Sequence, residues 1–169
     1  YYLIALRAFL GYFVAKDILS IPPEKIALSR PDKEKIVKFL TLEQLNKLFS
    51  IPDTSNIQGL RDRAILEVFF STGMRISELT SLNREQIKIK SGMEELELGI
   101  VGKGGRARTV YFSKSAIEWL DRYIKMRDAN IEDSKEKPLF LNYHGPAKAS
   151  RRLSPSAIEK NMKKYIIMA

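Results

Sequence analysis

Residues 96–112 constrain the fold most strongly, because they interrupt a largely helical chain with strand character. Apolar residues alternate with polar or small ones in LELGIV (96–101), and Val110 and Phe112 continue the alternation on a return strand. The Gly-Gly pair at 104–105 lies between the two runs and is a hairpin signal. The pattern predicts a mainly α fold with a small antiparallel β-sheet made of one hairpin, which is an α+β class.

Helices are expected before this hairpin. The segment LRDRAILEVFF (60–70) reads as a buried helix, for which Gly73 is a suitable C-terminal glycine. ISELTSL (76–82) then resumes the helical pattern. The start of an earlier helix is indicated by Thr41 and Gln44, which have capping-box spacing.

The region after the hairpin also reads as mostly helical. A helix is expected in SKSAIEWLDRYIKMRDA (113–129), where Ser115 and Glu118 have capping-box spacing. KPLFLNY (137–143) is consistent with a short strand, and a final helix has Pro155 near its first turn.

The composition describes a basic globular protein without cysteine. The 169 residues carry a formal net charge of +9, which favours a polyanionic partner, although a basic protein with no such partner is the alternative. The absence of cysteine excludes disulfides and thiolate metal sites, and it fits a cytoplasmic location. No run approaches the roughly 18 apolar residues of a membrane span.

The first residues form an apolar helical pattern with few upstream residues to cover it. Leu3, Leu6 and Leu10 fall close to one face, so we expect the chain to be part of something longer. The charged segment LSRPDKEKIVKFL (28–40) contains Pro31 and reads as a linker between two units.

Arg75 is placed unusually, just past the helix stop at Gly73 and at or beside the start of the next helix. A cation at that end opposes the helix macrodipole. An anion held by the guanidinium and the free backbone N–H groups would remove the conflict. The alternative is an ordinary ion pair between Arg75 and Glu78 on a solvated turn.

A second basic feature follows at the hairpin tip. Lys103 lies in VGKGGRART together with Arg106 and Arg108. A glycine-rich tip lets the backbone approach a surface closely, and three cations on it suit a DNA groove. Solvated turns also carry Lys and Arg, so the hairpin alone is a weak signal.

With these two motifs in order, the sequence resembles the tyrosine recombinase (phage integrase) family. TGMRISEL (72–79) is similar to the family's first arginine motif, and GKGGRARTV (102–110) is similar to its hairpin lysine motif. YYLIALRAFLGYF (1–13) resembles the last helix of the family's core-binding domain. The resemblance implies a core-binding end at 1–28, a linker at 29–40 and the first part of a catalytic domain at 41–169.

The resemblance also implies roles for individual residues. Arg75 matches the arginine that binds the scissile phosphate of DNA, and Glu78 matches an acidic position that orients the active-site groups. Lys103 matches the lysine that protonates the leaving 5′-hydroxyl. Arg106 and Arg108 are expected to bind phosphates. The alternative for Arg108 is that it is a solvated residue of the strand.

Further cations follow in the last part of the chain. Their charge and position fit contacts with the DNA backbone, and a solvated face is the alternative. They are Lys148, Arg151 and Arg152 in a basic loop, and Lys160, Lys163 and Lys164 in the final helix.

Two motifs of the family are not matched. The one histidine, His144, has Ala147 three positions later, so it does not form a His-x-x-Arg motif and is expected to be a surface residue. Tyr165 precedes the place of that motif and is expected to be structural, as is Trp119. We therefore expect a fragment whose nucleophilic tyrosine lies outside this chain, which leaves open whether the chain is itself an enzyme.

The resemblance implies site-specific DNA recombination by the parent protein, through a 3′-phosphotyrosine. No metal and no other cofactor is expected, because the phosphotyrosine conserves the energy of the broken phosphodiester. The implied partner is double-stranded DNA, bound by a homo-tetramer. The alternatives are a non-catalytic DNA-binding or regulatory protein of the same fold, and a basic helical scaffold with no nucleic-acid role.

Overall fold

The computed structural model describes residues 1–28, 39–130, 137–144 and 151–169, and it divides the chain into two compact units, Tyr1–Phe39 and Leu40–Ala169. Most of the predicted linker, residues 29–40, lies outside the described residues. The assignment of the first unit to a core-binding domain stays a prediction.

The first unit contains the helix α1 (Tyr2–Ala15) and the short 3₁₀ helix η1 (Pro23–Lys25). The two elements contact each other, and a Cβ placed on Gly11 would lie 3.6 Å from Cγ of Pro23. No residue of α1 is buried within the described part of the chain, and Phe9 is 56% exposed.

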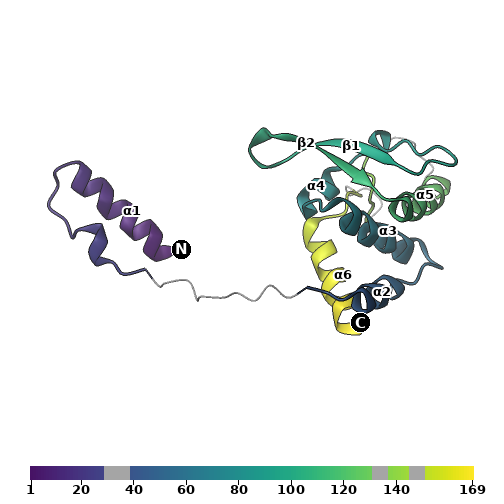
Figure 1. Ribbon diagram of the computed structural model, residues 1–169, viewed down its shortest axis with the longest axis horizontal. Helices are drawn as coiled ribbons and strands as arrows, with labels where there is room; N and C mark the ends of the chain where they lie inside the picture. Colours follow the sequence, from purple (N-terminus) through teal and green to yellow (C-terminus); the bar gives the residue numbers. More distant parts are fainter. Residues whose placement is uncertain (29–38, 131–136, 145–150) are drawn as a thin grey trace. The chain divides into compact units, whose positions relative to one another are not determined.

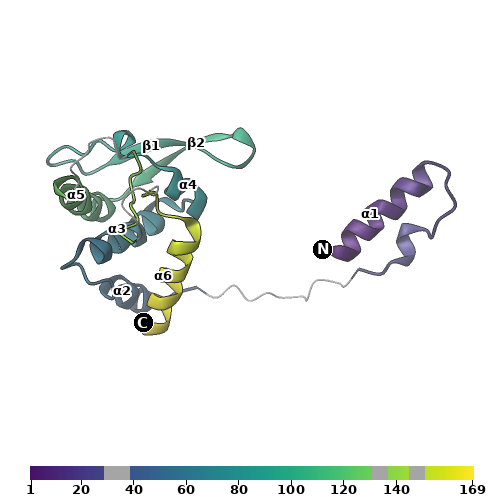
Figure 2. The same cartoon turned by 180° about the vertical axis from the view of Figure 1, so that it is seen from behind.

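The second unit is built around α3 (Ile57–Thr72), which contacts helices α2 (Leu42–Ser50) and α5 (Lys114–Ala129) and strand β2 (Ala107–Phe112) (Figures 1 and 2). Nine of its 16 residues are buried, so the prediction of a buried helix is confirmed. Helix α2 begins with the predicted capping box. The backbone N–H of Gln44 donates to Oγ1 of Thr41, and that of Thr41 donates to Oε1 of Gln44.

The hairpin has the expected register. Strand β1 (Leu96–Val101) pairs antiparallel with β2 (Ala107–Phe112), so that Leu98 lies opposite Val110. The turn between them, η3 (Lys103–Gly105), has φ of +78° at Gly104 and +74° at Gly105, where glycine is the residue of lowest strain. The prediction of a mainly helical fold with a two-stranded antiparallel sheet is confirmed.

Helix α5 matches the predicted range 113–129, but its N-cap lies two residues before the predicted one. Oγ of Ser113, not of Ser115, accepts the backbone N–H of Ala116, because the chain enters the helix directly after β2. The predicted strand at 137–143 is replaced by two isolated bridges, Asn83 with Pro138 and Leu141 with Arg152.

The remaining elements close the unit. Helix α4 (Ile76–Ser81) and the 3₁₀ helix η2 (Arg84–Gln86) precede the hairpin, and α6 (Pro155–Met168) contacts α2 and α4. The core brings together apolar side chains from helices α3, α4, α5 and α6, from the hairpin and from the connecting segments. They include Val68, Leu79, Ile87, Val110, Phe112, Leu120, Leu139, Leu153 and Ile158. Among the described residues, no helix is long and apolar enough to cross a membrane.

Candidate functional site

Gly73 determines where Arg75 lies. It ends α3 in the left-handed region, with φ of +59°, and its N–H donates to the carbonyl of Phe69 at 3.0 Å. The chain then turns into α4, and Arg75 becomes the N-cap residue of that helix. The Arg75 side chain is 59% exposed. The placement of an arginine at a helix start, predicted from the sequence, is therefore observed.

Glu78 holds Arg75 at two points. Oε2 of Glu78 accepts a hydrogen bond from the backbone N–H of Arg75 at 2.8 Å, and Oε1 accepts one from Nη1 of the Arg75 guanidinium at 3.0 Å. The carboxylate lies in the first turn of α4, where it is favourable to the helix dipole and offsets the unfavourable arginine. The ion pair considered as the alternative is thus present, and the Arg75 side chain remains more than half exposed.

A second arginine reaches Glu78 from the hairpin. Nη1 of Arg108 donates to Oε1 at 2.9 Å and Nη2 donates to Oε2 at 2.6 Å, which makes a two-point guanidinium–carboxylate contact. The Glu78 side chain is only 7% exposed. The hydrogen bonds from Arg108, and then from the backbone of Arg75, outweigh burial and lower the pKa of Glu78 to about 2.

Gly102 brings the end of β1 against this pair. A Cβ at Gly102 would lie 2.8 Å from Nη1 of Arg108 and 3.2 Å from Oε1 of Glu78, so glycine provides the space for the contact. Gly102 also lines an open cleft of about 420 Å³ with Arg75 and Glu78. The other lining residues are Ser77, Ser81 and Val101.

The lysine of the hairpin tip is the next residue in the sequence after Gly102, which lines this cleft. Lys103 directly follows Gly102 and begins the η3 turn, while its side chain lies outside the described part of the structure. The structure therefore brings the start of α4 together with Gly102, the base of the hairpin tip. The prediction that the Lys103 amine meets the same phosphate as Arg75 stays a prediction.

The other predicted DNA contacts fall in different environments. Arg106 is exposed on the hairpin, and Lys148 lies outside the described residues. Arg151 is half-buried, and its carbonyl accepts the N–H of Asn142. Their contacts with DNA stay predictions.

Arg152 has structural partners at the C-terminal end of α4. Its Nη1 donates to the carbonyls of Thr80 at 2.7 Å and Leu82 at 3.1 Å, and its Nη2 donates to Oδ1 of Asn83 at 2.6 Å. A guanidinium there satisfies carbonyls that the helix leaves without partners. This contact gives Arg152 a role in the fold, and its predicted contact with DNA stays a prediction.

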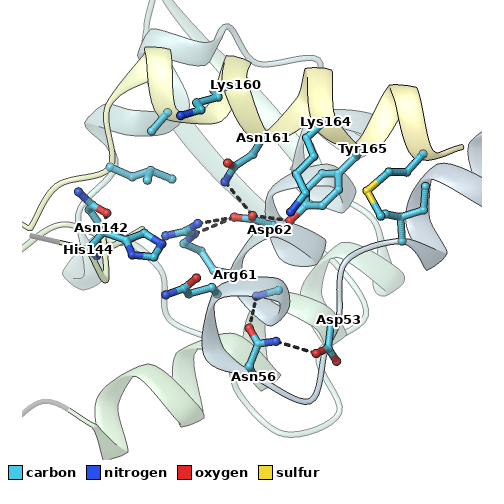
Figure 3. Close-up of a pocket in the computed structure, with 16 residues that line it drawn as sticks. Asp53, Asn56, Arg61, Asp62, Asn142, His144, Lys160, Asn161, Lys164 and Tyr165 are labelled. Atoms are coloured by element: carbon cyan, nitrogen blue, oxygen red, sulfur yellow. Dashed lines mark hydrogen bonds and ion pairs between the residues drawn. The ribbon is translucent and has the colours of Figure 1, made fainter.

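A larger polar cleft, of about 550 Å³, lies between the start of α3, the loop at 142–144 and α6 (Figure 3). Asp62 lies in it and accepts hydrogen bonds from Nε of Arg61, Nδ2 of Asn161 and the hydroxyl of Tyr165. Burial and the bond to Asp62 raise the pKa of Tyr165. Tyr165 therefore joins α6 to α3, which agrees with its predicted structural role.

His144 and Trp119 are not among the residues that line the Arg75 cleft. His144 is exposed, lines the larger cleft and donates its backbone N–H to Asn142. Trp119 is half-buried, with the guanidinium carbons of Arg63 and Arg122 each 4.6 Å from its ring centroid. Within the described part of the chain, no cluster of three or more acidic or histidine side chains could hold a metal ion.

Sequence reasoning missed the contact between Arg108 and Glu78, although a signal for it was present. In β2 the positions of Arg108, Val110 and Phe112 share one face, and the last two are buried. An arginine in phase with core residues needs an acidic partner, because an unpaired charge is costly to bury. The alternation of β2 therefore pointed Arg108 inward, towards a partner in the same unit.

The sequence also matches known proteins. Residues 38–169 match the family described as the phage integrase family. Tyrosine recombinase XerC of Chlamydia muridarum is 36% identical over 164 residues, covering 96% of this chain and 49% of that protein. XerC of Thermodesulfovibrio yellowstonii is 33% identical, covering 95% of this chain and 52% of that protein. The chain thus spans about half the length of these curated relatives.

Solved structures share the fold. A XerH site-specific recombinase bound to its difH substrate aligns with a TM-score of 0.65 and 22% identity, over 99% of this chain and 47% of that one. A XerA recombinase aligns with a TM-score of 0.61 and 20% identity, over 98% of this chain and 52% of that one. These likenesses confirm the predicted recombinase fold. Because the family match covers most of the sequence, this chain belongs to the phage integrase family, the tyrosine recombinases.

Proposed function

We propose that this chain serves site-specific recombination of double-stranded DNA, in which strands are cut and rejoined through a 3′-phosphotyrosine. The observation that carries this function is the cleft where the exposed Arg75 and the buried Glu78 lie beside Gly102, the residue before the hairpin lysine. The relatives named as tyrosine recombinases, and the XerH structure bound to difH, support it. A cytoplasmic location goes with this function.

Arg75 is proposed to bind the scissile phosphate. Attack on a phosphodiester builds negative charge on the non-bridging oxygens, and a preorganised guanidinium stabilises that charge. Glu78 is proposed to orient Arg75, since it fixes both the backbone N–H and one terminal nitrogen of that residue. An arginine that is fixed at these two points and has a side chain still 59% exposed suits an anion arriving from solvent.

Lys103 is proposed to protonate the leaving 5′-hydroxyl. An amine at a hairpin tip can enter a groove of DNA, and a lysine is suited to general-acid work when its pKa is lowered. Arg106, Lys148, Arg151 and Arg152 are proposed to contact the DNA backbone, and the assembly on DNA is proposed to be a homo-tetramer. We assign the nucleophile to none of the seven tyrosines of this chain.

DNA binding by this chain is tested by fluorescence anisotropy with a labelled duplex. If six or more phosphates are contacted, the affinity should fall about 10³-fold or more between roughly 50 and 200 mM salt. No measurable binding at low salt would support a basic scaffold without a nucleic-acid role, and would contradict the proposed function.

Strand cleavage is tested with Arg75→Ala in the recombinase that contains these residues, on a nicked substrate that traps the cleaved product. We expect cleavage to be lost while most of the DNA affinity remains, because many other cations contact the backbone. The control is Arg122→Ala on the exposed side of α5, which removes the same charge and should cleave normally. Normal cleavage by Arg75→Ala rejects the role of Arg75, and a wild-type protein that binds without cleaving supports a regulatory protein.

The role of Lys103 is tested with a better leaving group. Lys103→Ala should slow cleavage of ordinary DNA and should regain activity on a substrate whose 5′ leaving atom is sulfur, because a thiolate leaves without a general acid. If the sulfur substrate gives no recovery, Lys103 is not the acid.

A further inference from the structure

We propose that Arg108 is a positioning residue of the phosphate-binding site, acting through Glu78 on Arg75 and on the base of the hairpin tip. This role rests on the proposed function. It differs from the phosphate contact predicted from the charge of Arg108 and its place near the tip.

The contacts of the two arginines with Glu78 are unequal. Arg108 commits both terminal nitrogens to the carboxylate, at 2.9 and 2.6 Å, whereas Arg75 gives one terminal nitrogen at 3.0 Å. The Arg108 side chain is 37% exposed and that of Arg75 is 59% exposed. A phosphate can therefore reach Arg75 without breaking the pair, but it would have to displace Glu78 to be bound by both terminal nitrogens of Arg108.

Arg108 also changes the charge that an incoming phosphate meets. Arg75 and Glu78 alone sum to zero, because the carboxylate sits against the guanidinium that must attract the anion. With Arg108 paired to the same carboxylate, the three side chains sum to one positive charge. Pairing Glu78 with Arg108 thus leaves the charge of Arg75 available to the cleft.

The same contact joins two segments that approach DNA. Arg108 lies in β2, Glu78 lies in α4, and Gly102 passes so close to both that a Cβ would contact them. The backbone at Gly102 leads directly into the turn that carries Lys103. Fixing Arg108 on Glu78 therefore fixes the distance between the start of α4 and the base of the tip.

The test compares Arg108→Met with the wild type and with Arg75→Ala in the recombinase, using two nicked substrates. One substrate has an ordinary scissile phosphate, and the other has a neutral methylphosphonate at that position. If Arg108 acts through Arg75, Arg108→Met should cleave the phosphate about tenfold more slowly or worse. This defect should shrink on the methylphosphonate, where less negative charge has to be stabilised, as should the defect of Arg75→Ala.

A second variant separates charge from folding. In Arg108→Met with Glu78→Gln, the carboxylate that cancels Arg75 is also removed, so cleavage of the phosphate should recover at least in part. Arg122→Met on α5 is the control of equal charge loss and should match the wild type on both substrates. Thermal unfolding of every variant shows whether the protein is folded at the assay temperature.

The outcomes distinguish the two proposals. Normal cleavage by Arg108→Met, with Arg75→Ala inactive, overturns the positioning role and leaves the proposed function standing. An equal defect on both substrates without recovery in the double variant also overturns it, because Arg108 then does not act on the charge that Arg75 presents to the phosphate. Normal cleavage by Arg75→Ala rejects the proposed role of Arg75 and, with it, the positioning role of Arg108. No cleavage by the wild type contradicts the proposed function itself.

Discussion

Glu78 and Arg108 lie 30 residues apart in the sequence and form a two-point contact in which each carboxylate oxygen accepts one terminal guanidinium nitrogen. Arg108 comes from the hairpin and Glu78 from the first turn of α4, so the contact holds two separate elements together. Arg75 adds a third link through the same carboxylate. The site is therefore organised around one buried acid between two arginines.

Acid should weaken the fold through Glu78. Its pKa is about 2 in the folded protein, mainly because Arg108 donates to the charged form, against an ordinary value of 4.5. The stabilisation is complete above about pH 4.5 and is lost as the pH falls towards 2. Over this window, urea unfolding should show a steeper fall in the free energy of unfolding for the wild type than for Glu78→Gln. Glu43→Gln on the exposed face of α2 should keep the steeper fall, and parallel curves for Glu78→Gln would refute the expectation.

Removing Asp62 should be far more damaging than removing its hydroxyl partner. Asp62→Ala leaves the buried guanidinium of Arg61 without its ion pair, and we expect a loss of about 3–5 kcal/mol in the free energy of unfolding. Tyr165→Phe removes one hydrogen bond of 2.7 Å and should cost about 1 kcal/mol. Denaturant unfolding measures both, and equal losses would mean that the ion pair contributes little.

Gly59→Ala should destabilise the protein although alanine is the better helix former. A Cβ at Gly59 would lie 2.0 Å from the carbonyl oxygen of Asp53, so the loop before α3 would have to move. We expect a cost of about 2 kcal/mol or more. Gly73→Ala meets no atom within 4 Å but has φ of +59°, and it should cost about 1 kcal/mol. A thermal melt comparing the two variants tests this order, and a stabilising Gly59→Ala would contradict it.

Arg152→Met should lower stability through the end of α4. The change removes charged hydrogen bonds to the carbonyls of Thr80 and Leu82 and to the side chain of Asn83, and we expect a loss of about 1.5–3 kcal/mol. Lys163→Met on the exposed side of α6 removes the same charge and should leave stability unchanged. Denaturant unfolding and duplex binding are measured together. An Arg152→Met variant that weakens DNA binding without losing stability would favour the DNA contact alone.

Two predictions that depended on near neighbours in sequence were confirmed. Thr41 and Gln44 are three residues apart and form the expected capping box. Gly73 ends α3 with a left-handed φ, as its place after the buried run predicted. The predicted N-cap of α5 was wrong by two residues, because Ser113 and Ser115 both offer a cap and only the end of β2 decides between them.

The sequence by itself determined the helices, the hairpin and the placing of Arg75 at a helix start, because capping residues, glycines and periodicity act over a few neighbouring positions. Only the tertiary structure decided which partners the charges take. Arg108 binds Glu78 and Arg152 binds the end of α4, while the contacts expected between these two arginines and DNA stay predictions. Hydrogen bonds and ion pairs act over a few ångströms, and only folding brings residues 30 or 70 positions apart within that reach.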